Sequence, residues 1–331
     1  MPAMTISEPQ SIALVDSALA HTDATALREA LVAVLGGPGA ALRLRALDHA
    51  GLLTRAIPEL EPARHTDQPI VHFLSVLDHS IETVAAVEWL LAQIDQIALP
   101  GEALPAAIRA NPSLAYRSRY AAQLREHIAQ PVGRYPRPAL FKLGALLHDI
   151  AKPQTKQDKP GGGVSFHEHQ TIGGEVAAGI ARRLGFEPGE AGYVRAVVRE
   201  HMRPGQLAAQ GEVTLRAVQR FFSATGDAGP DVLLHLLADH MATRGPNLSV
   251  RSWIAQAQWI DALLETIWGE EVAITPPLAN GDDLMRELGL RPGPQIGQLL
   301  AAIGEAQASD TIATREEALA LARRMLERAR R

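Results

Sequence analysis

The chain contains 331 residues, of which 47% are hydrophobic and 21% are charged, and its formal net charge is −5. This composition indicates a folded globular protein of two or three domains, and it excludes collagen-like, low-complexity and disordered classes. Because the chain has no cysteine, any metal must be held by histidine, aspartate or glutamate. No apolar run reaches the ~18 residues that span a bilayer, and the start lacks a basic secretory signal, so we expect a cytoplasmic protein with no membrane partner.

The first part of the chain has a polar start followed by apolar residues at helical spacing. Residues 1–22 are expected to form a flexible tail, because their beginning is polar and aperiodic. Asp23 is suited to cap a helix that ends at the Gly-Gly-Pro sequence that follows. A second helix is predicted at about 39–49, so that residues 23–66 form a small helical region.

The rest of the chain is also predicted to be helical. A long helix is predicted at about 73–94 and an apolar helix at 138–150, whereas prolines break residues 105–136 into shorter helical pieces. Residues 153–164 are polar, end in glycines and favour a loop or hairpin. Further helices are predicted at 170–184, 189–201, 214–223, 231–243, from about 250, and at 282–288, 295–305 and 315–330. Strand patterns are nearly absent, so the fold class is all-α with at most one small β-hairpin near 153–166.

The histidines and carboxylates with the strongest metal-ligand pattern centre on His148-Asp149, at the end of an apolar helix. Adjacent residues point about 100° apart on a helix, so both reach one ion only near a helix end, and Pro153 supplies that end. An unpaired carboxylate within an apolar helix would be costly, which favours a ligand role for Asp239. Four further candidates lie on separate predicted helices, as in sites built between helices of a bundle: His79, His169, His201 and Asp239.

These residues occur in short sequences that together resemble one protein family. The sequences are LDHSIET around His79, LLHDIAKP around His148-Asp149, FHEHQTIGGE around His169, VREHMRPGQL around His201 and LLADHMA around Asp239. Their order resembles the HD superfamily of metal-dependent phosphohydrolases, and in particular the HD region of bacterial tRNA nucleotidyltransferases (CCA-adding enzymes) and poly(A) polymerases. GPGAALRLRALDHAGLLTRAIPEL resembles their neck and body helices, and PLANGDDLMRELGLRPGPQIGQLLAAIGEAQASDTIATREEAL resembles their C-terminal region.

The resemblance covers about residues 25–325 and implies a domain organisation. Residues 23–66 would be neck and body helices, 67–248 an HD-domain helical bundle, and 249–331 a C-terminal helical tail. The family's nucleotidyltransferase head carries an Asp-x-Asp pair, which is absent from this chain. We therefore expect no head domain and no nucleotidyltransferase activity from this polypeptide.

The resemblance also implies a set of metal ligands. His79, His148, Asp149 and Asp239 would form the core site, while His169 and His201 would extend it to a second ion with Asp149 as the bridge. His167 is the alternative to His169, and His72 and His235 are interpreted as supporting or packing groups. One or two divalent ions are expected, and imidazole and carboxylate ligands do not distinguish Mn, Ni, Co, Fe, Mg or Zn.

Basic residues near these ligands suggest substrate contacts. Lys152 is expected to contact the substrate phosphate and to act with Asp149 in catalysis, and Arg203 is a second substrate-binding candidate. Lys156 and Lys159 either support Lys152 or simply belong to a polar loop. RNA phosphates are possible partners for four arginines whose alternative is a solvated helix face: Arg216, Arg220, Arg244 and Arg251.

The leading hypothesis is a metal-dependent phosphohydrolase that acts on a phosphoester of a nucleotide, a 2′,3′-cyclic phosphate or an RNA end. One alternative is an RNA-binding, tRNA-holding half of a split tRNA nucleotidyltransferase, with a separate head protein as partner. The other is a regulatory HD protein that binds a nucleotide signal without turning it over. The complete set of six ligand-type residues favours hydrolysis, because a binding module does not need them.

Overall fold

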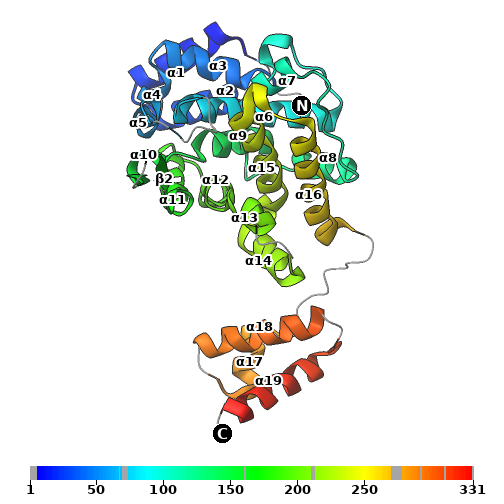
Figure 1. Cartoon of the computed structure of the whole chain (residues 1–331). Helices are drawn as coiled ribbons and strands as arrows, with labels where there is room; N and C mark the ends of the chain where they lie inside the picture. The colour runs from blue at the N-terminus through cyan, green and yellow to red at the C-terminus, as the bar shows by residue number, and fades with distance from the viewer. Residues whose placement is uncertain are drawn as a thin grey trace. The chain divides into compact units, whose positions relative to one another are not determined.

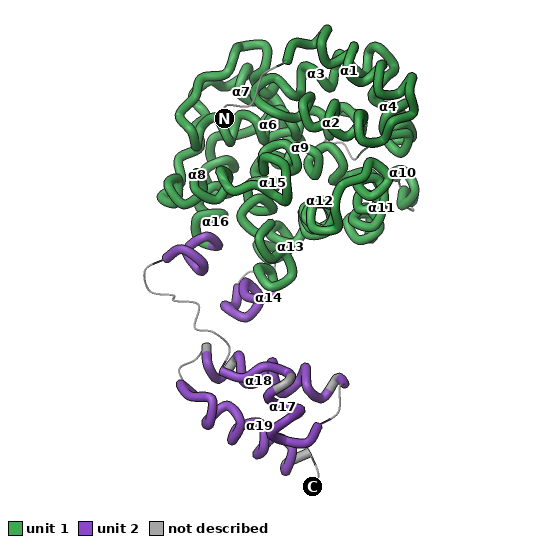
Figure 2. Tube along the Cα trace, turned by 180° about the vertical axis from the view of Figure 1, so that it is seen from behind, with its two compact units in different colours: residues 1–211, 221–262 green, residues 212–220, 263–331 purple. Residues whose placement is uncertain are grey.

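The computed structural model describes residues 6–66, 68, 74–159, 162–209, 213–269, 278–290, 293–308 and 311–329 (Figure 1). This part of the chain is helical apart from one two-stranded hairpin and an isolated bridge, as predicted. The chain divides into two compact units: residues 1–211 with 221–262, and residues 212–220 with 263–331 (Figure 2). Helices α14 (Leu215–Thr225) and α16 (Val250–Trp268) cross the boundary between them.

The N-terminal region is more ordered than the sequence predicted. Residues 1–22 were expected to be a flexible tail, but Glu8–Ala20 form helix α1. A capping box explains this helix: the Ser7 side chain accepts from the Gln10 amide, and the Gln10 side chain accepts from the Ser7 amide. Val15 is fully buried, and α1 packs against α2 and α3. The remaining elements of this region are α2 (Ala24–Leu35), α3 (Ala40–His49), α4 (Leu53–Ala56), a 3₁₀ turn (Pro58–Leu60) and α5 (Glu61–Arg64).

A buried ion pair joins this region to the helical bundle. Glu88 of α6 (Val76–Asp95) accepts hydrogen bonds from the Ala40 and Ala41 amides at 2.8 and 3.1 Å, and so caps the start of α3. Lys142 of α9 (Arg137–Leu147) lies 3.1 Å from Glu88. Burial lowers the pKa of Lys142, and Glu88 opposes this shift. The pair therefore fixes α3 against α6 and α9, and both of its side chains are buried.

Five helices surround the candidate ligands: α6, α9, α11 (His169–Arg183), α12 (Pro188–Glu200) and α15 (Gly229–Arg244). Helix α12 packs on both α9 and α11, and α6 packs on both α9 and α15. Glycines allow the closest approaches, because a Cβ on Gly144 of α9 would lie 2.7 Å from a methyl carbon of Val197 on α12. The other short helices of this unit are Gly101–Ala103, α7 (Ala106–Ala110), α8 (Ala121–Ala129), α10 (Lys152–Thr155), α13 (Arg203–Ala209), Gly226–Ala228 and Gly245–Asn247.

The segment that was predicted to be a loop or a small hairpin forms a hairpin. Strand β1 (Lys156–Asp158) pairs antiparallel with β2 (Val164–Phe166), with Lys156 opposite Phe166. It lies between α10 and α11, and therefore directly before His169 in the chain. None of the described helices is both long and apolar enough to cross a bilayer.

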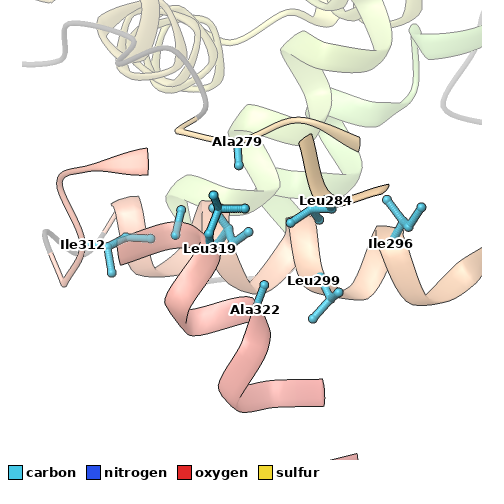
Figure 3. Close-up of a cluster of buried hydrophobic side chains, with 9 residues drawn as sticks. Ala279, Leu284, Ile296, Leu299, Ile312, Leu319 and Ala322 are labelled. Atoms are coloured by element: carbon cyan, nitrogen blue, oxygen red, sulfur yellow. The ribbon is translucent and has the colours of Figure 1, made fainter. Parts of the chain in front are cut away.

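The C-terminal helices form their own core. Helices α17 (Gly281–Leu288), α18 (Pro294–Ala308) and α19 (Arg315–Ala329) each contribute buried apolar residues, among them Leu284, Leu299 and Leu319 (Figure 3). The Asn280 side chain caps α17 by accepting from the Asp283 amide at 2.9 Å. These helices match the predicted segments 282–288, 295–305 and 315–330 to within a few residues.

The contact between α9 and α12 gives a test of the bundle packing. Gly144→Ala places a methyl group against Val197, and we expect it to lower the free energy of unfolding by about 1–3 kcal/mol. Gly192→Ala on α12 is the control, because its Cβ meets no atom within 4 Å and alanine is favoured over glycine in a helix by about 0.5–1 kcal/mol. Urea unfolding measures both; equal stability of the two variants would contradict the packing.

Candidate metal centre

Four of the predicted ligands converge at one point in the first unit. The Nε2 atoms of His79 and His148 lie 3.2 Å apart. Asp239 Oδ1 is 3.0 Å from His79 Nε2, and Asp149 Oδ2 is 3.0 Å from His148 Nε2. Residues from α6, from α15 and from the end of α9 therefore present nitrogen and oxygen atoms to one small volume.

The other two predicted ligands form a second group around the same aspartate. The Nε2 atoms of His169 and His201 lie 3.4 Å apart. Asp149 Oδ1 is 3.4 Å from His169 Nε2 and 4.0 Å from His201 Nε2. Because its two carboxylate oxygens face different groups, Asp149 lies between them, in the position that the sequence analysis assigned to a bridging ligand.

Backbone carbonyl groups orient three of the imidazoles. His148 and His201 directly follow the last residues of α9 and α12, where the final carbonyls have no partner in the helix. Their Nδ1 atoms lie 2.8 and 2.7 Å from the carbonyl oxygens of Ala145 and Val198. His169 Nδ1 makes the same contact with the Phe166 carbonyl at 2.7 Å. Since a carbonyl only accepts, Nδ1 carries a proton in each ring, and in the neutral form of the ring the Nε2 lone pair points to the centre.

Burial favours a neutral imidazole at His201, whereas the neighbouring charges favour a protonated His148 and ionised carboxylates. Burial lowers the pKa of His201 to about 3. Burial also opposes protonation of His148, but Asp149 outweighs it and raises the pKa of His148. Burial would raise the pKa of Asp149, yet His148 and Lys152 hold it well below its usual range. Burial likewise opposes ionisation of Asp239, but its hydrogen bond with His79 keeps its pKa well below normal.

The donor set fits a divalent metal ion. Two imidazole nitrogens bound to one ion at about 2.0–2.1 Å would lie roughly 3–3.4 Å apart at tetrahedral or right angles, and the observed Nε2 separations are 3.2 and 3.4 Å. Imidazole and carboxylate together suit first-row transition metals, and the fixed Nδ1 protons are the arrangement that metal-ligating histidines use. The two groups that share Asp149 could therefore hold two ions.

Lys152 lies at this centre, but its contacts differ from a free phosphate-binding lysine. It is buried, with its Nζ 2.6 Å from Asp149 Oδ2, and it donates to Gln68 Oε1 at 2.7 Å. The Phe166 ring lies beneath it, with 5.4 Å between Nζ and the ring centroid. Sequence reasoning missed Gln68, for which no pattern gives a signal. It also missed Phe166, although that residue begins the FHEH sequence.

The remaining histidine candidates and Arg203 differ in their exposure and contacts. His167 is exposed, and His169 is the histidine of that pair that joins the cluster. His235 is fully buried, with its ring centroid 4.8 Å from that of His148, so it packs beside the ligands as predicted. His72 falls outside the described residues. Arg203 forms a 3.0 Å ion pair with Glu200.

The other basic candidates are spread over several elements. Lys156 and Lys159 are exposed, on β1 and just after it. Arg244 and Arg251 are exposed near the junction of α15 and α16, whereas Arg216 and Arg220 belong to α14.

Known protein families and individual proteins are similar in sequence to this chain. Residues 76–239 match the HD domain family, and residues 261–322 match the family described as tRNA nucleotidyltransferase domain 2. The chain is 30% identical over 302 residues to an A-adding tRNA nucleotidyltransferase of Deinococcus radiodurans, covering 91% of this chain and 58% of that protein. It is 29% identical over 295 residues to a CC-adding tRNA nucleotidyltransferase of Thermus thermophilus, covering 89% and 55%. A bifunctional uridylyltransferase/uridylyl-removing enzyme of Mycobacterium tuberculosis is 28% identical over 230 residues, covering 67% and 22%.

The fold, the histidine and aspartate cluster and the family match identify residues 76–239 as an HD domain. More particularly, the chain resembles the neck, HD and C-terminal regions of bacterial tRNA nucleotidyltransferases. It spans a little over half the length of the two tRNA nucleotidyltransferases named above.

Divalent ions are expected to stabilise the fold through this cluster. At a concentration 100-fold above its Kd, a bound ion adds about 2.7 kcal/mol to the free energy of unfolding. Thermal unfolding after EDTA treatment and addition of Mn²⁺ or Co²⁺ measures this gain, and we expect His148→Ala to remove most of it. The control is His21→Ala, because His21 Nδ1 also contacts a backbone carbonyl, at 2.7 Å, but lies on the exposed end of α1. An equal gain in the His148 and His21 variants would contradict the site.

Proposed function

We propose that this chain is a metal-dependent phosphohydrolase of the HD class, which cleaves a phosphoester of a nucleotide, a 2′,3′-cyclic phosphate or an RNA end. The single observation that supports it most is the convergence of six imidazole and carboxylate side chains on two adjoining points that share Asp149. A divalent ion bound there would lower the pKa of a water molecule and polarise a phosphoryl oxygen. Both effects promote hydrolysis at neutral pH without a nucleophile from the protein.

The chain's own residues would then position the reactants. His79, His148, Asp149 and Asp239 would hold the first ion, and His169 and His201 the second, in each histidine through Nε2. Five of the six ligand side chains are 1–8% exposed, and that of Asp239 is the most exposed at 23%. In the reaction, a water oxygen forms a bond to phosphorus, the bond to the leaving oxygen breaks, and that oxygen takes up a proton.

Lys152 would place a positive charge at the edge of this site. Its ammonium group is fixed by Asp149, Gln68 and Phe166, so little side-chain freedom is lost when a phosphate binds. Charge-assisted hydrogen bonds from an ammonium group to phosphoryl oxygens would stabilise the negative charge of the transition state. Asp149 and Lys152 are thus the proposed catalytic residues, and Arg203 is a further substrate-binding candidate next to His201.

Hydrolysis of bis-p-nitrophenyl phosphate and 2′,3′-cyclic AMP with added Mn²⁺, Ni²⁺ or Co²⁺ tests this function. We expect activity in the unaltered chain and its loss in the His148→Ala/Asp149→Ala variant. If the unaltered protein instead binds the nucleotide tightly and releases no product, the regulatory alternative replaces hydrolysis.

Lys152→Met is expected to reduce kcat/KM by about 10- to 100-fold, since a hydrogen bond to a charged group contributes about 1.5–3 kcal/mol. Its metal content, measured by elemental analysis, should stay unchanged. Lys159→Met is the matched control, because Lys159 is exposed after β1 and should retain full activity. Equal kinetics of the two variants would exclude the role of Lys152.

We also propose that the chain binds tRNA, because residues 261–322 match a tRNA nucleotidyltransferase domain. Arg216 and Arg220 lie one turn apart on α14 and would contact RNA phosphates. Arg216→Glu/Arg220→Glu should weaken tRNA binding and reduce the slope of log K against log salt by about 0.7–0.9 per lost phosphate contact. Arg55→Glu/Arg182→Glu makes the same change in net charge with exposed arginines on α4 and α11. An affinity and slope equal to those of this control would exclude the role.

A further inference from the structure

The metal centre has one exposed side. Five of the six candidate ligands have side chains 1–8% exposed, whereas that of Asp239 is 23% exposed. On α15 the half-buried positions are Leu236, Asp239, His240 and Thr243, which share one face because they are spaced by three and four residues. This face of α15 therefore borders the more exposed edge of the centre in the part of the chain that the structure describes.

A hydrogen bond joins this face to the start of α16. His240 Nε2 lies 2.7 Å from Ser252 Oγ, and Ser252 is in the first turn of α16. Thr243 Oγ1, on the same face of α15, donates to Asp239 Oδ1 at 3.2 Å. The beginning of α16 is thus held beside the exposed edge of the metal centre.

Two arginines flank this contact and have no carboxylate partner in the part of the chain that the structure describes. Arg244 lies one turn after His240 on α15, and Arg251 directly precedes Ser252; both are exposed. Many other arginines of this unit are paired: Arg203 lies 3.0 Å from Glu200 and Arg195 lies 2.6 Å from Glu175. An unpaired guanidinium offers its five donors to a phosphate, the group that it matches best.

We propose that Arg244 and Arg251 form a subsite for a second phosphate, so that the HD site prefers the end of an RNA oligonucleotide to a mononucleotide. The inference rests on the proposed hydrolase function. Arg244 follows Asp239 by five residues, which is about 7.5 Å along the helix axis and about 140° around it, whereas it follows His240 by one turn on the same side of the helix. Its long side chain would have to extend back past His240 to hold a phosphate next to the centre. The reacting phosphoester would lie at the metal centre, and the next phosphate of the strand would lie over the junction of α15 and α16. His240 and Ser252 are positioning residues, because they hold the two helices together.

The test compares kcat/KM for 2′,3′-cyclic AMP with that for an adenosine trinucleotide that ends in a 2′,3′-cyclic phosphate. We expect the unaltered chain to prefer the trinucleotide at least tenfold. Arg244→Gln/Arg251→Gln should lose this preference and keep its rate on 2′,3′-cyclic AMP within twofold. Arg55→Gln/Arg182→Gln is the control, because it removes two exposed positive charges from α4 and α11 of the same unit and should keep the preference.

The outcomes separate this inference from the function on which it rests. Hydrolysis of both substrates without a preference, or with a preference that survives in Arg244→Gln/Arg251→Gln, would overturn the subsite. If the unaltered chain hydrolyses neither substrate, the hydrolase function fails. Calorimetric binding of the trinucleotide 3′-phosphate and of adenosine 3′-monophosphate then tests the subsite alone. Tighter binding of the trinucleotide that depends on the two arginines would support it, and equal affinities would overturn it.

Discussion

The structure depends on an electrostatic constraint between imidazole nitrogens. His148, His169 and His201 each give their Nδ1 proton to a backbone carbonyl, so each presents an Nε2 lone pair to a buried centre. In both groups two Nε2 atoms lie within 3.4 Å of each other, next to an ionised carboxylate. Lone pairs at this distance repel unless a proton or a cation lies between them. Burying such a cluster without a bound cation costs free energy. The cluster is therefore suited to holding cations.

The bundle produces this arrangement with ordinary helix chemistry. Two of the three histidines end helices, where the unpaired carbonyls of the last turn are available to a side chain. Close packing of α9 on α12 at Gly144 holds the two helices that end at His148 and His201 against each other. The buried Glu88–Lys142 pair fixes the N-terminal helices to α6 and α9. The geometry of the site is therefore set largely by helix ends and close contacts between helices, and at His169 by the turn after β2.

Many of the helices and metal-ligand candidates could be predicted from the sequence, for identifiable reasons. Helices α6, α9, α12 and α15 were predicted to within a few residues because their apolar stripes or helix-stop signals are strong. Residue spacing alone left the ligand set open, and the resemblance to the HD family selected it. The structure then placed His169 rather than His167 in the cluster, a choice that depends on the turn after β2.

The features that could not be predicted from the sequence also have physical explanations. Helix α1 was missed because its face is made of small residues, and its capping box of Ser7 and Gln10 was the available signal. The contacts of Lys152 with Gln68 and of His240 with Ser252 join separate elements, and no periodic pattern records such a pairing. These contacts position Lys152 and the start of α16 next to the metal centre. The surroundings of the centre were therefore less predictable than its ligands.

The most direct test of the central claim is anomalous diffraction from crystals of the full chain soaked with Mn²⁺ or Co²⁺. The account predicts an anomalous peak between His79, His148, Asp149 and Asp239, and a second peak between Asp149, His169 and His201 if two ions bind. Ions found only at surface carboxylates, with the Nε2 atoms of these histidines in contact with one another and with no ion, would contradict it.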